Sequence, residues 1–254
     1  MVSDFHVHTS LSCDSTAEMS EYIAFAKKSN IGAICFTEHV DFNKNDSGYR
    51  YYDAERFFDV YQSNYNEYEE NPRIYAGIEF SEPHLYGDEL SKLSVYPYDF
   101  ILGSVHWVGN MFPCHEVRQR YSAKEFFERY WKEVYEMVKH GGFDCVSHMD
   151  FPKRYYQEVY YQRAMMKEIF EIMLDKNIVL EVNTSPGRKG YTYTMPGKEL
   201  LEIYKECGGK YVTIGSDAHA VSDLGANYYD AKALVEEMHL ESVIFQQRKM
   251  VVLR

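Results

Sequence analysis

Short apolar segments alternate along the chain with longer segments in which apolar residues recur at helical spacing. The apolar segments predict β-strands at residues 2–6, 33–37, 73–80, 100–106, 144–148, 178–183 and 212–215. The longer segments predict helices at residues 17–29, 54–70, 123–140, 157–176, 197–207 and 230–238. Several strands, among them IGAICF and NIVLEV, are almost continuously apolar. This is typical of parallel strands that are covered on both faces.

The repeated alternation of strand and helix predicts a fold of the α/β class. Its repetition about seven times indicates either a barrel or a doubly wound sheet. No linker, low-complexity tract or internal repeat divides the 254 residues. Because β/α barrels of roughly this length commonly fold as one unit, we expect a single domain over residues 1–254.

Composition excludes several functional classes. The formal net charge is −12, and no run of Lys or Arg indicates nucleic-acid binding. No apolar stretch approaches the ~18 residues that a membrane span requires, and the first residues do not resemble a secretory signal. The cysteines are scattered, without a CxxC pair, which favours free thiols in a reducing compartment. We therefore expect a cytoplasmic protein without nucleic-acid or membrane partners, and make no prediction of its oligomeric state.

Most of the ten histidines fall where predicted strands end. Glu79 and Asp217 lie at such positions too. The histidines at or just beyond the carboxyl ends of strands are His6, His8, His39, His106, His148 and His219. In a barrel the carboxyl ends of the strands converge on one mouth, so residues far apart in sequence become neighbours there. We therefore expect these side chains to form one site.

The spacing of two pairs supports a metal site. His6 and His8, in FHVHTS, are two residues apart, so both side chains leave the same face of an extended strand. Asp217 and His219, in SDAH, have the same spacing after another strand. Either pair alone is weak evidence, because surface residues at this spacing occur by chance. Together with FTEH, GIEF, GSVH and VSH at other strand ends, they predict bound metal.

The candidate ligands narrow the choice of metal. Six imidazoles and a few carboxylates, without a candidate thiolate, suit Zn, Mn or Fe better than Ca or Mg. A structural zinc site needs only four ligands, so eight or nine candidates imply two or three divalent ions. Such ions suit hydrolysis, and they would let an acidic protein bind a small phosphorylated substrate. We expect no organic cofactor.

Seven motifs follow one another in order: FHVHTSLSCDS, FTEHVDF, AGIEFS, ILGSVHWV, SHMDFPKRY, LEVNTSPGRKG and TIGSDAH. They resemble those of the polymerase-and-histidinol-phosphatase (PHP) superfamily, and most closely those of its histidinol-phosphate phosphatase branch. The likeness spans nearly the whole chain, including the closing segment VIFQQRKMVVLR. It implies a distorted (β/α)7 TIM-like barrel that holds a trinuclear metal centre.

The resemblance also implies three metal sites. The first would use His6, His8, Glu79 and Asp217, the second Glu79 as a bridge with His106 and His148, and the third Asp14, His39 and His219. Of these, Glu79, Asp217, His39 and His219 would also take part in catalysis. Asp14 stands where other PHP branches have a histidine and this branch often has an aspartate. Glu38, Asp4 and Asp150 are neighbouring acids that could orient ligands, although Asp4 and Asp150 could equally be solvated or capping residues.

Two arginines are candidates for binding phosphate. Arg154, in FPKRYY, and Arg188, in SPGRKG, both follow strand ends on the predicted mouth. Because a guanidinium group binds phosphate oxygens bidentately, we expect both to bind the substrate. We expect the adjacent Lys153 and Lys189 to be solvated.

These features predict a metal-dependent phosphomonoesterase. The resemblance favours hydrolysis of L-histidinol phosphate to L-histidinol and phosphate in histidine biosynthesis, by attack of a hydroxide that bridges two ions. Another small phosphate ester stays open as the substrate. An amidohydrolase-like enzyme is a second hypothesis, but its usual carboxylated lysine at the end of the fourth strand is replaced here by GSVH. A metal-dependent binding protein without enzyme activity is a third.

Overall fold

The computed structural model describes residues 1–68 and 71–252. Its strands form one sheet in chain order, and each of the first seven pairs in parallel with the next. The strands that correspond to the predicted ones are β1 (Val2–Val7), β2 (Ile31–Val40), β3 (Arg73–Ser81), β4 (Phe100–Ser104), β5 (Cys145–Val146), β6 (Val179–Asn183) and β7 (Tyr211–Gly215). The predicted α/β class is therefore confirmed.

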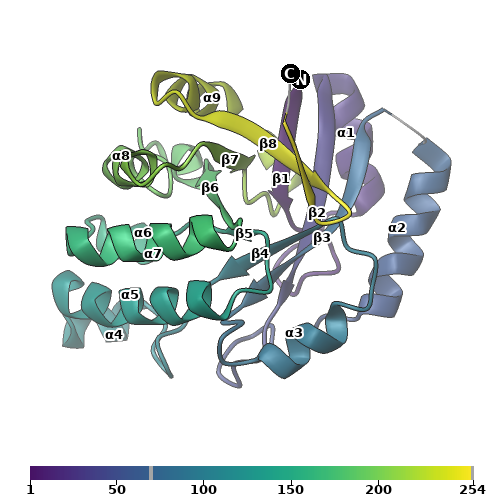
Figure 1. The fold of residues 1–254 in the computed structure, drawn as a ribbon. Helices are drawn as coiled ribbons and strands as arrows, with labels where there is room; N and C mark the ends of the chain where they lie inside the picture. The colour runs from purple at the N-terminus through teal and green to yellow at the C-terminus, as the bar shows by residue number, and fades with distance from the viewer. Residues whose placement is uncertain (69–70, 253–254) are drawn as a thin grey trace.

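The chain ends in two further strands that the sequence pattern did not predict. β8 (Glu241–Gln246) pairs in parallel with β7, and β9 (Lys249–Val252) pairs antiparallel with β8. The closing segment therefore forms a hairpin. It crosses the sheet near the chain termini in Figure 1.

The first and seventh strands approach each other near their carboxyl ends. β8 pairs only with the first residues of β7, where Tyr211 lies opposite Glu241. Beyond β7, the backbone N–H of His8 donates to the carbonyl oxygen of Ala218 at 2.9 Å, and the N–H of Ala218 donates to that of His6 at 3.2 Å. The residues that follow β1 and β7 are thus neighbours, as the prediction of a common mouth requires.

Helices surround the strands on the outer face of the curved sheet (Figure 1). Those that match the predictions are α1 (Met19–Ser29), α2 (Ala54–Tyr68), α5 (Ala123–His140), α7 (Arg163–Asp175), α8 (Lys198–Glu206) and α9 (Tyr228–Glu237). Short helical turns that were not predicted are α3 (Gly87–Leu93), α4 (His115–Arg120), α6 (Lys153–Tyr156), η1 (Ser185–Lys189) and η2 (Val221–Asp223). The predicted start of a helix at residue 157 was wrong, because Gln157 has a left-handed backbone that ends α6. The predicted residues 69–70 of α2 lie outside the described residues.

Two apolar clusters stabilise this arrangement. The larger lies between strands and helices, with side chains such as Phe36 of β2 and Trp131 of α5. The smaller consists of strand residues on the other face of the sheet, including Phe5, Phe100 and Phe245. The rings of Phe100 and Phe245 lie 5.0 Å apart, so β8 contributes directly to this second cluster.

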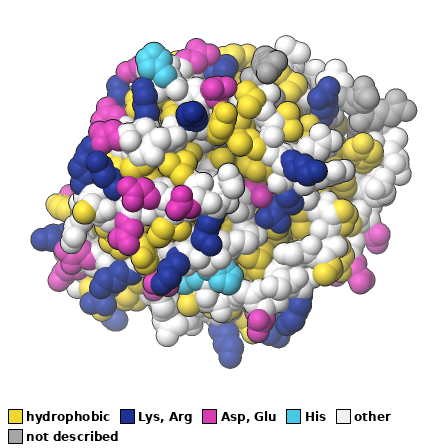
Figure 2. All heavy atoms as spheres, viewed as in Figure 1, with side chains coloured by type: hydrophobic (Ala, Val, Ile, Leu, Met, Phe, Trp, Pro, Cys, Tyr) yellow, Lys and Arg dark blue, Asp and Glu magenta, His cyan; other side chains and the backbone are white. Residues whose placement is uncertain are grey.

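No helix among residues 1–68 and 71–252 is long and apolar enough to cross a membrane. On the face in Figure 2, Lys and Arg are interspersed with Asp and Glu. All five cysteines are free thiols.

Candidate metal centre

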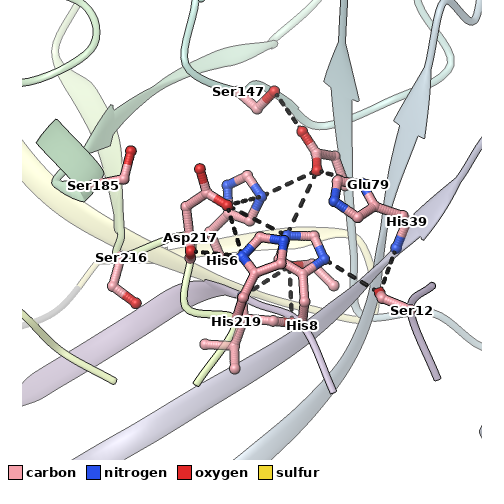
Figure 3. Close-up of polar contacts among 12 residues, drawn as sticks. His6, His8, Ser12, His39, Glu79, Ser147, Ser185, Ser216, Asp217 and His219 are labelled. Carbon is pink, nitrogen blue, oxygen red and sulfur yellow. Dashed lines mark hydrogen bonds and ion pairs between the residues drawn. The ribbon is translucent and has the colours of Figure 1, made fainter. Parts of the chain in front are cut away.

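The structure brings together all nine side chains that were predicted as metal ligands. Figure 3 shows several of them converging on Glu79 and Asp217 from different strands. Three groups of three possible ligands each have donor atoms within 4.8 Å of one another: His6, Glu79 and His148; His6, His8 and Asp217; His8, His39 and His219. Most of these side chains are buried, so the fold, and not solvent exposure, fixes their positions.

The first predicted group surrounds one point. Nε2 of His6 lies 3.2 Å from Oε2 of Glu79 and 4.0 Å from Oδ1 of Asp217. Nε2 of His8 lies 3.6 Å from each of the same two oxygens. A tetrahedral zinc ion with bonds of about 2.1 Å places its ligand atoms roughly 3.4 Å apart. The observed separations match this spacing.

The second group uses the other oxygen of the same carboxylate. Oε1 of Glu79 lies 2.8 Å from Nε2 of His148 and 3.4 Å from Nε2 of His106. The two imidazole nitrogens are themselves 3.4 Å apart. Glu79 therefore directs one oxygen to each group, which is the geometry of a bridging ligand.

The third group is the most exposed. Oδ2 of Asp14 lies 3.1 Å from Nε2 of His219 and 3.5 Å from Nε2 of His39. Nδ1 of His39 also lies 3.1 Å from Oε2 of Glu79. The His8 ring stacks on those of His39 and His219, with centroids 4.1 and 4.3 Å away. The third group is thus continuous with the first.

Unsatisfied buried atoms test whether these residues fit a metal. Nε2 of His6, Nε2 of His8, Nδ1 of His39 and Oε2 of Glu79 are buried and have no hydrogen-bond partner among the described residues. Buried polar atoms are normally hydrogen-bonded, so a cluster of exceptions requires an explanation. Divalent cations at this position would satisfy all of them. The donor set therefore fits Zn, Mn or Fe.

Electrostatics favours positive charge at this point. Burial alone would raise the pKa values of Glu79 and Asp217, but neighbouring imidazoles and, for Asp217, the Arg154 guanidinium hold both well below the usual range. Burial lowers the pKa of His8, and the nearby His39 and His219 lower it further. An imidazole binds metal in its neutral form, so the lowered pKa of His8 favours metal binding.

Contacts outside the ligand groups orient the imidazoles. Nδ1 of His6 lies 2.6 Å from Oε1 of Glu181 on β6. Serine hydroxyl groups hold Nδ1 of three other ligands: Ser12 that of His8 at 3.3 Å, Ser81 that of His106 at 3.0 Å, and Ser147 that of His148 at 3.3 Å. Such contacts leave Nε2 directed at the metal position.

Sequence reasoning did not identify Glu181 or the three serines. A signal for Glu181 was present, because it is the one charged residue inside the apolar strand NIVLEV. The serines have no comparable signal, since hydroxyl groups are common near strand ends.

The three neighbouring acids have different roles. Glu38 accepts hydrogen bonds from the Ser12 hydroxyl at 2.6 Å and the Thr9 N–H at 3.0 Å, so it supports Ser12. Asp4 accepts from the Ser216 N–H at 2.9 Å and so fixes the backbone before Asp217. Asp150 accepts from the Gly197 N–H at 3.3 Å, away from the ligand groups.

The two predicted phosphate-binding arginines lie beside the ligands. Nη2 of Arg154 donates to Oδ2 of Asp217 at 2.6 Å and to the Ser185 hydroxyl at 2.9 Å. Arg188 donates to the carbonyl oxygens of Ser216 and Asp217, the latter at 2.8 Å. Arg188 therefore supports the backbone of a ligand.

The expectation for one adjacent lysine was wrong. Lys153 is buried and not solvated: its ammonium lies 3.6 Å from Asp150, 3.7 Å from Glu199 and 4.3 Å from the centre of the Tyr193 ring. Two acids and an aromatic face stabilise the charge inside the protein. Lys189 is exposed, as expected.

Two cavities open onto the ligand groups. The larger, of about 460 Å³, is lined by Cys13, Asp14, His39, Asp41, Asn45, Asp46, Ser47, His106, Trp107, Phe112, Cys114, His148, Phe151, Arg154, Tyr155, Asp217 and His219. The smaller, of about 240 Å³, is lined by Arg154, Ser185, Pro186, Arg188, Lys189, Tyr191, Tyr193, Asp217 and His219. The ligand groups therefore lie within reach of a small molecule.

Fold and site together define an α/β protein of the TIM-like kind, with a candidate metal centre where its strands end. The model of the PHP domain matches residues 4–185, well over half of the chain. The chain belongs to the PHP domain family. This confirms the family resemblance that the ordered motifs indicated.

Relatives of similar length extend this result. The chain is 32% identical to a protein named probable histidinol-phosphatase from Clostridium acetobutylicum, with 98% of this chain and 99% of the relative covered. It is 26% identical to the histidinol-phosphatase of Lactococcus lactis subsp. lactis, covering 92% and 90%. A crystal structure of the histidinol phosphate phosphatase of that subspecies, complexed with zinc, L-histidinol and phosphate, matches with a TM-score of 0.87 at 23% identity, covering 98% of each chain. The predicted TIM-like PHP fold and the likeness to the histidinol-phosphate phosphatase branch are thereby confirmed.

Proposed function

We propose that this protein is a metal-dependent phosphomonoesterase that hydrolyses L-histidinol phosphate to L-histidinol and phosphate in histidine biosynthesis. The observation that carries the proposal is the Glu79 carboxylate, whose two oxygens face two separate groups of imidazoles. A bridging carboxylate between two ions is the arrangement that metal-assisted hydrolysis of phosphate esters uses. The named activity of the relatives supports the choice of substrate.

The proposed ligands are the nine converging side chains. Ions would be held by His6, His8, Asp14, His39, Glu79, His106, His148, Asp217 and His219. When bound, Zn, Mn or Fe would supply a nucleophile at neutral pH and positive charge for the phosphate oxygens. Glu79 and Asp217 would keep the ions close together.

Arg154 is the residue proposed to bind the phosphate group. It lines both cavities, so its guanidinium can bind phosphate oxygens while Nη2 stays on Asp217. The contact between the guanidinium group and the phosphate oxygens would offset the negative charge that develops in the transition state. Arg188 is proposed to act beside it, chiefly by holding the carbonyl oxygens next to Asp217.

Two imidazoles are proposed to lie nearest the leaving oxygen. The side chains of His39 and His219 are 15% and 28% exposed, whereas those of His6 and His8 are fully buried. Both of the exposed imidazoles line the larger cavity, and neither His6 nor His8 does. We assign them to the alcohol oxygen: an ion held by these rings would supply positive charge there, and either ring would deliver a proton only when it is not bound to metal.

The arrangement of the strands supports a single domain. A single sheet runs from β1 to β9. We propose one domain over residues 1–254 in the cytoplasm, without nucleic-acid or membrane partners. An amidohydrolase-like chemistry is not favoured, because Glu79 occupies the bridging position and the buried Lys153 is held by Asp150 and Glu199.

The proposal is tested by kinetics on a panel of phosphate monoesters with Zn, Mn and Fe. L-histidinol phosphate should give the highest kcat/KM, and His6→Ala and Asp217→Asn should each abolish turnover while the protein still folds. His239→Asn, at an exposed histidine just after the end of α9, is the matched control. A strong preference for another ester would overturn the substrate, and absence of phosphatase activity with every metal would overturn the enzyme class.

A further inference from the structure

The lining of the larger cavity has two parts, one shared with the smaller cavity and one not. At one end it shares Arg154, Asp217 and His219 with the smaller cavity, which also contains Arg188 and Lys189. This end is rich in cationic side chains and suits an anion. The part that only the larger cavity has, called the acidic end here, is lined by acidic and aromatic side chains, among them Asp41, Asp46, Trp107, Phe112 and Tyr155. A substrate that spans the cavity therefore has its anionic group at Arg154 and its organic group at the acidic end.

Of the two acids at that end, Asp46 is already engaged. Its Oδ2 accepts a hydrogen bond from Nε1 of Trp107 at 2.7 Å, and its Oδ1 accepts one from the Gly48 N–H at 2.7 Å. Asp46 therefore orients the indole ring of Trp107. It is a support for the cavity wall, and its charge is largely committed to these two donors.

Asp41 is different, because one of its oxygens has no partner. The side chain is only 4% exposed and lines the cavity. Oδ1 has no hydrogen-bond partner among the described residues, and the nearby Nδ1 of His106, at 3.9 Å, is too far for a hydrogen bond. Leaving a buried carboxylate oxygen without a donor is costly. A cationic donor from the substrate would satisfy it.

Aromatic rings form the wall beside Asp41. Phe112 lies at the centre, with ring centroids 5.3 Å from Trp107, 5.4 Å from Tyr155 and 5.9 Å from Phe151. Such faces bind flat heteroaromatic rings and organic cations. Because the Trp107 indole is held by Asp46, this wall is already formed before any ligand enters.

We propose that this end of the cavity is the specificity site for a cationic organic group, with Asp41 binding its ammonium and Trp107 and Phe112 contacting its ring. The inference rests on the proposed function, because it takes the phosphate to lie at the Arg154 end. It explains how the same metal chemistry would select L-histidinol phosphate, whose alcohol part carries an amine and an imidazole, over phosphate esters of uncharged alcohols. Asp41 is thus a specificity residue that acts on binding.

The test compares a cationic and a non-cationic ester in the metal-loaded enzyme. Asp41→Asn should raise KM for L-histidinol phosphate about tenfold to a hundredfold, the effect of losing a charged hydrogen-bond partner. The kcat/KM for p-nitrophenyl phosphate should stay within about twofold. Asp88→Asn, the same change at an exposed position of α3, is the control and should alter neither.

A binding measurement provides a second readout. By calorimetry, L-histidinol alone should bind the Asp41→Asn variant about tenfold to a hundredfold more weakly than wild type, whereas 3-(imidazol-4-yl)propan-1-ol, which lacks only the amine, should bind both equally. Metal content is measured for each protein.

Each outcome decides between the possibilities. Equal losses on both esters, or a loss of bound metal, would show that Asp41 supports His106 and would overturn the inference while leaving the proposed function intact. Unchanged binding of L-histidinol would place the amine elsewhere and would overturn it too. If wild type hydrolyses neither ester, the proposed function fails, and the calorimetric comparison still decides whether Asp41 binds the amine.

Discussion

Nδ1 of His6 lies 2.6 Å from Oε1 of Glu181, although the two residues are 175 positions apart in the sequence. This contact turns Nε2 of His6 toward Glu79, 3.2 Å away. The second oxygen of Glu181 accepts a hydrogen bond from the His148 N–H at 2.6 Å. One buried carboxylate therefore positions a candidate ligand in each of the two groups that Glu79 joins.

The Glu181→Gln variant should bind metal more weakly without losing its fold. The amide keeps the size of the side chain but removes the charge that makes the His6 imidazole a better ligand. Losing a partner of this kind typically weakens metal binding about 10–100-fold. Competition with a chelator, followed by metal analysis, measures the change. Glu202→Gln, at an exposed position of α8, is the control, and equal affinity in both variants would show that Glu181 has no such role.

The positions of polar residues at the carboxyl ends of strands made much of this site predictable from the sequence. His6 and Glu79 lie near the carboxyl ends of apolar strands, and Asp217 just follows one. Parallel strands that end at one mouth necessarily bring such residues together. Their proximity was therefore a consequence of topology and needed no knowledge of side-chain packing. The division of the two Glu79 oxygens between two groups also agrees with the bridge that the family resemblance implied.

The parts that could not be predicted depend on packing between distant segments. Glu181 lies two residues after Val179 on β6, so both face the same side of the strand. Only the assembled sheet shows that on this side Val179 packs in the smaller apolar cluster while Glu181 contacts His6. The hairpin of β8 and β9 was missed for a similar reason, because its apolar residues pack against strands from the first half of the chain.

Arg154→Lys should impair phosphate binding and leave the metal in place. The lysine keeps a positive charge near Asp217 but cannot reproduce the two parallel hydrogen bonds of a guanidinium group. We expect kcat/KM to fall about tenfold to a hundredfold and inhibition by inorganic phosphate to weaken in parallel. Steady-state kinetics and metal analysis together test this. Arg56→Lys, on the exposed side of α2, is the control, and a loss of metal in Arg154→Lys would argue for a role in supporting Asp217 instead.

Arg188→Lys should have the opposite effect to Arg154→Lys: it should weaken metal binding more than phosphate binding. Arg188 holds the carbonyl oxygens of Ser216 and Asp217, and Asp217 has a backbone φ of 56°, which is uncommon for a residue other than glycine. Without this support the segment can relax and move a ligand. We expect metal affinity to fall about tenfold, with a smaller effect on phosphate inhibition at saturating metal. A variant that keeps full metal affinity but loses phosphate binding would instead place Arg188 on the substrate.

Glu82 makes the stability of the metal-free protein depend on pH. Burial raises the pKa of its carboxyl group to about 8, against an ordinary value of 4.5, although His106 and the N–H groups of His106 and Trp107 act in the opposite direction. The folded state therefore binds this proton more tightly than the unfolded state does. The resulting stabilisation is fully present below pH 4.5 and is lost as the pH rises through about 8.

The Glu82→Gln variant isolates this effect, because glutamine mimics the protonated carboxyl group. Relative to wild type, its free energy of unfolding should increase between about pH 5 and about pH 9, on the order of a few kcal/mol. Urea unfolding of both metal-free proteins across this range measures the difference. Glu202→Gln should show no such trend, and a pH-independent difference for Glu82→Gln would contradict the raised pKa.

Phe245→Ala should destabilise the protein while sparing the candidate site. Phe245 comes from β8, is 3% exposed and stacks its ring 5.0 Å from that of Phe100 inside the strand-only cluster. Removing a buried aromatic ring typically costs about 3–5 kcal/mol, because the cavity left behind closes only partly. The ligand groups lie at the carboxyl ends of the strands and include no residue of β8 or β9, so kcat/KM measured well below the unfolding temperature should stay near that of wild type.

Val251→Ala, at a 41% exposed position of the same hairpin, is the matched control and should cost far less. A loss below about 1 kcal/mol for Phe245→Ala would mean that the hairpin does not complete the core, and a loss of kcat/KM in the folded variant would mean that the hairpin and the metal centre are coupled.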